Sequence, residues 1–167
     1  NNVPAAERRR QREGERSRLR AVARTEPASR AARELTVWLR EWPDDVEMRE
    51  VLVDRLAAAG DVDAALIAMQ PLLNGPHGRR WITREIDLAR INGRPAVAIA
   101  RLDDVVSRAD ATLSDRVTFA ELLLGEREFS RAEVVLRTAS HVSVGCDSRL
   151  LDLTDRIDAV EDALLDL

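Results

Sequence analysis

The chain has 167 residues, 45% of them apolar and 34% charged, with a net charge of −4, values typical of a folded protein rather than a disordered one. Aromatic residues make up only 3%, and the abundant Ala, Leu, Arg and Glu favour helices, so we expect no sheet. All 26 basic residues are arginine, which excludes P-loop nucleotide-binding proteins, protein kinases and Schiff-base enzymes because each needs a lysine. Such a composition is typical of a GC-rich genome, for example an actinobacterial one.

Amphipathic segments follow one another in pairs along the chain. A basic segment, residues 1–11, comes first and is expected to be frayed. The clearest first helices are predicted near Val46–Ala59, Trp81–Ile91 and Leu113–Leu124, each followed by a turn that contains Gly60, Gly93 or Gly125. We therefore predict helical hairpins at approximately 12–45, 46–78, 79–112 and 113–146.

A small alanine returns at intervals of 34, 33 and 34 residues, at Ala31, Ala65, Ala98 and Ala132. A large apolar residue follows each alanine by four positions, and another apolar residue comes three positions later. This spacing puts all three on one helix face, with the alanine where another backbone must come close. The pattern predicts that successive hairpins nest against one another. The following residues are Leu35, Met69, Leu102 and Leu136, then Trp38, Leu72, Val105 and Ala139.

The repeat resembles the tetratricopeptide repeat, a helical hairpin of about 34 residues. The best match is residues 46–79, where Leu52, Val53 and Leu56 fall at the family's first-helix packing positions. The resemblance covers roughly residues 12–146. It implies an all-α fold, a right-handed α-solenoid of antiparallel hairpins.

Three features depart from the family's pattern. The turn that contains Gly125 is two residues longer before its alanine than the two earlier turns. Aliphatic residues replace its frequent Trp and Tyr in the first helix, and Pro71 lies inside a predicted second helix. Because proline lacks an N–H and clashes with the preceding turn, we expect Pro71 to kink or shorten that helix.

In such a stack the first helices line a concave groove, and their outward positions form its surface. The resemblance therefore implies a non-catalytic scaffold that binds a partner protein or peptide in this groove, with no cofactor. One subgroup of the family grips a C-terminal carboxylate with Lys, Asn and Arg; this chain lacks the Lys and Asn, so we expect no such binding. The expected groove residues are Arg16, Arg20, Arg24, Glu50, Asp54, Thr83, Asp87, Arg90, Val117 and Glu121.

The two ends of the sequence carry opposite charge. Residues 1–24 hold eight arginines and three glutamates, a net charge of +5, whereas residues 147–167 hold seven acids and two arginines, a net charge of −5. Apolar residues at helical spacing in 147–167 predict a terminal helix that caps the last hairpin, or a dimerising helix. The alternative function is therefore self-association, or regulation of a larger protein of which the chain, beginning with Asn1, is a piece.

Enzymatic, metal and nucleic-acid functions are disfavoured. Cys146 is the single cysteine, and His77 and His141 lie far apart, so no metal-ligand cluster is visible. Carboxylates on exposed helix faces are usually solvated rather than catalytic. The arginines before residue 25 have no aromatic neighbour on which a base could stack. The loop at residues 74–80 has glycines and two arginines that could cradle an anion, but a plain linker is favoured.

We predict a cytoplasmic protein. No run of 18 or more apolar residues predicts a transmembrane helix, and no leader resembles a signal peptide.

Overall fold

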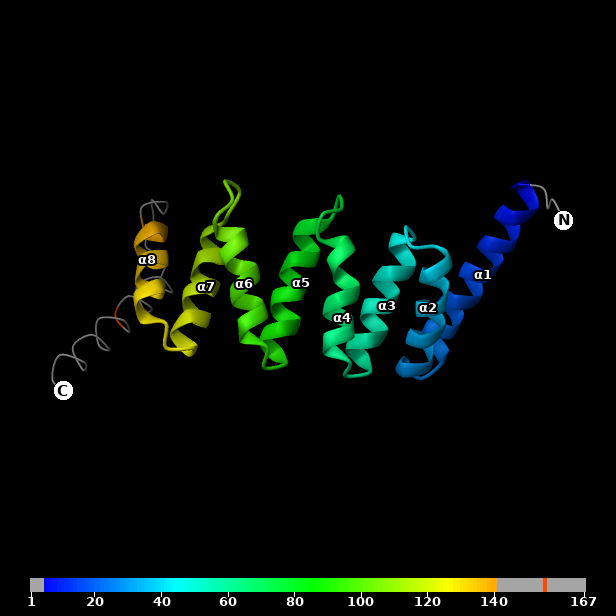
Figure 1. Cartoon of the computed structure of the whole chain (residues 1–167), viewed down its shortest axis with the longest axis horizontal. Coiled ribbons are helices and arrows are strands. Elements are labelled where there is room, and N and C mark those ends of the chain that lie inside the picture. Colours follow the sequence, from blue (N-terminus) through cyan, green and yellow to red (C-terminus); the bar gives the residue numbers. More distant parts are fainter. Residues whose placement is uncertain (1–4, 141–154, 156–167) are drawn as a thin grey trace. The chain divides into compact units, whose positions relative to one another are not determined.

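The computed structural model describes residues 5–140 and Asp155, and within this part every element is a helix and no strand occurs (Figure 1). The prediction of an all-α protein is therefore confirmed. The predicted terminal helix at 147–167, apart from Asp155, and His141 and Cys146 lie outside the described residues. The elements are α1 (Ala5–Thr25), α2 (Ala28–Glu41), α3 (Val46–Ala58), α4 (Val62–Met69), the 3₁₀ helix η1 (Gln70–Leu72), α5 (Gly78–Ile91), α6 (Pro95–Val106), α7 (Leu113–Gly125) and α8 (Phe129–Ser140).

The chain divides into two compact units, residues 1–88 and 89–167. In the first unit, α2 packs on α1 and α3, α4 packs on α3, and α1 also contacts α3. In the second unit, α7 packs on both α6 and α8. None of the described helices is long and apolar enough to cross a bilayer.

The alanine repeat corresponds to a repeated pattern of burial. Ala31, Ala65, Ala98 and Ala132 are all fully buried, and the eight apolar residues that follow them at four and seven positions are buried as well. Protein interiors are close-packed, and a small methyl group at such a position lets a neighbouring helix pack closely. The i, i+4, i+7 spacing therefore identified one packed face on each of α2, α4, α6 and α8, with η1 completing the face of α4.

Helix α1 begins at Ala5, inside the segment that we expected to be frayed. It remains mostly polar, and its buried apolar residues are Leu19 and Ala23, both in its second half. The first half of α1 is therefore held to the unit chiefly by polar contacts, which are described below.

The helix ends follow ordinary capping chemistry. Asp45 directly precedes α3, and its side chain accepts a hydrogen bond from the backbone N–H of Met48. Asp61 directly precedes α4 and accepts one from the backbone N–H of Ala64 in the same way. Thr112 and Asp115 form a reciprocal capping box at α7.

Two of the three expected glycine turns have the left-handed backbone. Gly60 and Gly93 have φ of +78° and +67°. In the third turn the left-handed residue is Arg127 instead of Gly125, because α7 continues through Gly125.

Pro71 shortens the second helix of its pair, as expected. The α-helical hydrogen bonds of α4 end at Met69, and residues 70–72 form the tighter 3₁₀ turn η1. Such a turn tolerates proline near its start, where no intrahelical N–H bond is needed. Leu72 and Leu73 are nevertheless buried, so the chain continues along the core after the α-helix has ended.

Candidate binding surface on the first unit

Asp45 is the centre of a polar cluster that joins α1 to the α2–α3 corner. Its side chain is only 2% exposed, and Arg16 engages both of its oxygens: Nη2 donates to Oδ1 at 3.1 Å and Nε lies 2.9 Å from Oδ2. Trp38 Nε1 also donates to Oδ2 at 3.1 Å, and Met48 N donates to Oδ1 at 3.3 Å. One buried carboxylate therefore fixes three helices at once.

Aromatic rings extend this cluster towards the N-terminal half of α1. The rings of Trp38 and Trp42 lie 5.8 Å apart between centroids, and the guanidinium carbon of Arg12 lies 4.3 Å from the centroid of Trp42. A cation above an indole face is favourable because the face is electron-rich. Arg12 thus adds a second attachment of α1 to the corner.

Glu47, in the first turn of α3, receives two arginines from α1. Arg20 binds it with two hydrogen bonds, Nε to Oε1 at 2.6 Å and Nη2 to Oε2 at 2.8 Å, and Arg16 Nη2 also reaches Oε2 at 2.8 Å. The hydrogen bonds from Arg20 hold the pKa of the Glu47 carboxyl below its ordinary value and raise the pKa of Arg20. These expected groove arginines therefore bind a neighbouring helix.

Similar contacts join α3 to α5. Trp81 Nε1 donates to Glu50 Oε1 at 3.2 Å, and Arg84 forms an ion pair with Asp54. The partners lie 31 and 30 residues apart, about one repeat. The same faces of α1, α3 and α5 are thus linked in turn by polar side chains.

The expected groove residues differ in burial and in pairing. Arg16, Arg20, Glu50 and Asp54 are half-buried and paired between helices, whereas Arg24, Thr83, Asp87 and Arg90 are exposed. Glu121 on α7 is half-buried; it and Arg90 belong to the second unit. Val117, expected on the groove surface, is a core residue with 1% exposure, because α7 turns this position towards its neighbours in the second unit.

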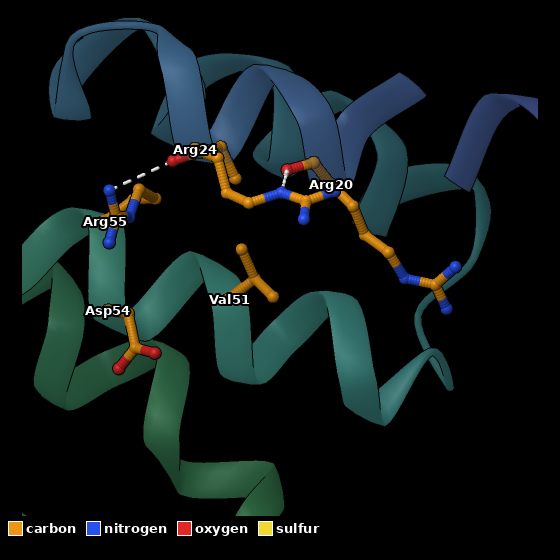
Figure 2. A pocket seen from close by; sticks show the side chains of 6 residues that line it. Arg20, Arg24, Val51, Asp54 and Arg55 are labelled. Carbon is orange, nitrogen blue, oxygen red and sulfur yellow. Dashed lines mark hydrogen bonds between the residues drawn. The ribbon is translucent and has the colours of Figure 1, made fainter. Parts of the chain in front are cut away.

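The structure brings three of the expected residues together around one pocket. Arg20 and Arg24 come from α1 and Asp54 from α3, and Ala23, Val51 and Arg55 complete a hollow of about 290 Å³ between these helices (Figure 2). Val51 points from α3 towards α1, whereas Asp54 points away from α1 (Figure 2). The pocket has an apolar floor and a basic upper rim.

Two hydrogen bonds hold the arginines of this rim. Arg24 Nε donates to the carbonyl of Arg20 at 3.2 Å, and Arg55 Nη1 donates to the carbonyl of Ala23 at 3.0 Å (Figure 2). In the part of the chain that the structure describes, neither Arg24 nor Arg55 makes an ion pair. Asp54, the carboxylate in the pocket lining, is paired with Arg84 instead, so the charges of Arg24 and Arg55 face the pocket uncompensated.

Sequence reasoning missed Asp45, Arg55 and Glu85. Asp45 lies two residues after Pro43 and directly before a predicted helix, and this position was a capping signal that could have identified it. Glu85 is 1% exposed on α5 and accepts a hydrogen bond from Gln70 Nε2 at 2.8 Å. No sequence signal distinguishes Glu85 from an exposed helical glutamate.

The two glycine amides of the loop at residues 74–80, at Gly75 and Gly78, both donate hydrogen bonds within the chain. Gly78 N donates to the Gly75 carbonyl at 2.9 Å, and Arg80 N and Trp81 N both donate to the His77 carbonyl. Gly78 serves close packing instead, because a Cβ there would lie 2.1 Å from the Leu73 carbonyl oxygen. Among the described residues, no group of His, Cys, Asp or Glu is arranged to hold a metal ion.

Comparison with known proteins assigns no family. The chain matches no protein-family model, and no curated protein sequence is significantly similar to it.

Proposed function

We propose that this chain is a non-catalytic interaction scaffold, a right-handed α-solenoid of hairpins similar to tetratricopeptide repeats, which binds a peptide or helix of a partner protein along its first helices. The observation that supports the proposal most is the pocket between α1 and α3. Its lining includes Arg20, Arg24 and Asp54, three residues that the repeat register of the sequence also places on the groove. A concave, mostly apolar hollow with a few charged groups is the usual form of a recognition site.

The polar links between successive first helices support the same architecture. In a stack of hairpins each first helix meets the next one at about one repeat length, and the pairs from α1 to α3 and from α3 to α5 have this separation. In the second unit, Arg131 on α8 lies 3.5 Å from Asp103 on α6, which links two second helices in a similar way. These links hold neighbouring hairpins in one register.

The internal pairing of the groove carboxylates supports a binding role over an enzymatic one. A general acid or base needs a carboxylate that reaches the substrate, but Glu50 is bound by Trp81 and Asp54 by Arg84. A partner that lies along the surface needs only exposed side chains beside them, such as Thr83 and Asp87. Because they are four residues apart, these two share one face of α5.

The arginines of α1 support a protein partner more than nucleic acid. Arg12, Arg16, Arg18 and Arg20 are all engaged with carboxylates of the same chain. Nucleic-acid binding needs arginines that are available to neutralise phosphates. The pairing also reduces the positive charge that α1 offers for head-to-tail self-association.

Peptide display on the immobilised full chain tests the proposal. We expect peptides to be enriched and their affinity to change by about tenfold or more when Asp54 and Asp87 are both changed to Arg, because the two substitutions reverse the charge that the ligand meets on the groove. The matched control is Glu41→Arg with Glu126→Arg, which makes the same charge change at exposed acids outside the groove. Asp87→Arg alone leaves the Asp54–Arg84 ion pair intact and so separates the loss of that pair from the change of charge on α5.

Circular dichroism should show unchanged helicity in all these variants. If no peptide is enriched, or if the enriched peptides bind the groove variants and the control variant equally, the groove proposal is wrong. Light scattering at several concentrations tests the self-association alternative, which a strict monomer would eliminate.

A further inference from the structure

The charges around the α1–α3 pocket are unevenly compensated. Arg20 is bound by Glu47, and Asp54 is bound by Arg84, so these two charges are largely neutralised within the chain. Arg24 and Arg55 have no such partner among the described residues. The pocket rim therefore carries uncompensated positive charge in a chain whose net charge is −4.

The arrangement of Arg24 suits an incoming acceptor. Its Nε donates to the Arg20 carbonyl, which holds the side chain along α1, while its two terminal nitrogens keep their hydrogens for a ligand. The side chain is exposed, so a ligand reaches it without opening the helix pair. Held guanidinium groups lose less conformational entropy on binding a carboxylate than free ones.

The floor of the pocket is apolar and small. Val51 and Ala23 supply it, and the volume of about 290 Å³ lies at the lower end of ligand pockets. A hollow of this size fits one or two aliphatic side chains rather than a folded domain or a nucleotide. An aliphatic side chain and a carboxylate close together in one ligand would satisfy both parts of the pocket.

We propose that this pocket anchors an acidic peptide segment of the partner protein. A Glu or Asp side chain of the peptide binds Arg24, with Arg55 beside it, and an adjacent Leu, Ile or Val side chain lies on Val51 and Ala23. This inference rests on the proposed groove function and adds the direction in which the ligand lies. Its acidic residues lie over α1, and any basic residues lie towards Asp54 and α5. Charge complementarity determines this choice, because a basic segment over α1 would face Arg24 and Arg55 directly.

The sequences enriched by peptide display on the full chain test this direction. We expect an aliphatic residue with Asp or Glu within four positions of it. Arg24→Glu should weaken binding of the enriched peptide about tenfold or more, because a charged hydrogen bond is replaced by repulsion. The matched control is Arg33→Glu, an exposed arginine on α2 that lies outside the pocket lining. Among the described residues Arg24 hydrogen-bonds only within its own helix and its side chain is exposed, so its substitution should leave folding intact.

A double-mutant cycle tests whether Arg24 and the acidic residue of the peptide contact each other directly. Replacing the acidic residue of the peptide by its amide should weaken binding to the wild-type chain but have little further effect on Arg24→Glu. Val51→Asp should also abolish binding, because it places a charge in the apolar floor. Additive effects in the cycle, or enrichment of neutral or basic peptides, would overturn this inference while the groove function stands. Failure to enrich any peptide would instead count against the groove itself.

Discussion

Arg55 on α3 donates a hydrogen bond to the backbone carbonyl of Ala23 on α1, at 3.0 Å. In a continuing helix that carbonyl would receive the N–H of residue 27, but residue 27 is proline and has none. The preceding bond of the series, from Glu26 N to the Val22 carbonyl at 2.9 Å, is still made. Arg55 therefore satisfies a carbonyl that Pro27 leaves without its usual donor.

The first prediction follows from this substitution of donors. Arg55→Ala should lower the free energy of unfolding by about 1–3 kcal/mol, because a partly buried carbonyl loses its partner. Urea denaturation followed by circular dichroism measures the change. Arg33→Ala, on the exposed side of α2, serves as the control and should change stability by less than about 0.5 kcal/mol.

Pro27→Ala supplies the missing N–H, so Arg55→Ala should cost less in that background than in the wild-type chain. Equal costs in the two backgrounds would contradict the account of Pro27.

Asp45 should be far more important for stability than its neighbour Asp44. Asp45→Ala removes the acceptor of Trp38 Nε1, the N-cap of α3 and the partner of Arg16, so we expect a loss of about 3 kcal/mol. Asp44→Ala should be nearly neutral, because Asp44 is exposed. Thermal unfolding of both variants measures the difference. Tryptophan fluorescence should change for Asp45→Ala only, and similar unfolding temperatures for the two variants would contradict the cluster.

Replacing Gly78 and Gly14 by alanine should change the stability of the chain in opposite directions. Gly78→Ala places a Cβ 2.1 Å from a backbone oxygen, and the shift that this forces should cost about 1–3 kcal/mol. Gly14→Ala meets nothing within 4 Å in the middle of α1 and should stabilise the chain by about 0.5–1 kcal/mol. Urea midpoints that move in the same direction would show that the close approach at Gly78 is not maintained.

The repeated alanines should not accept larger side chains. Ala98→Leu should lower stability by about 1–3 kcal/mol, because the fully buried position has no room for three more carbon atoms. Ala100→Leu, two residues later on the exposed side of α6, is the control and should change little. Comparable denaturation midpoints for the two leucine variants would contradict the packing that the repeat implies.

Lowering the pH should weaken the attachment of α1 to α3 that Glu47 provides. The pKa of Glu47 is lower in the folded chain than its ordinary value of 4.5, so the stabilisation is complete above that ordinary pKa and is lost as the pH falls through the lower pKa of the folded chain. Because Glu47 is about half exposed, the contribution is modest, about 0.2–1 kcal/mol.

The free energy of unfolding of wild type and of Glu47→Gln, compared between pH 6 and about pH 3, measures this contribution, because the variant lacks the titrating carboxyl. The stability difference should shrink as the pH falls. A constant difference over that range would show that Glu47 does not titrate in this way, and Glu41→Gln provides the control for an exposed acid on α2.

The sequence by itself determined the helices and their buried faces. The alanine spacing identified positions such as Ala65 and Ala98, and the glycine and proline signals located most turns, because helix periodicity and capping depend on residues only a few positions apart. The repeat register also predicted Arg20, Arg24 and Asp54 on one surface, and all three line the pocket between α1 and α3.

The tertiary structure alone decided the pairing of side chains on that surface. Asp45 meets Arg16 across 29 residues of sequence, and Arg55 meets the Ala23 carbonyl across 32. Such pairs depend on the rotation of each helix about its axis and its offset along the neighbouring helix, to within a few tenths of an ångström. Many arrangements of exposed arginines and acids satisfy the same hydrophobic pattern. Only the packing of the helices therefore decides which charged side chains form ion pairs within the chain and which, like Arg24, do not.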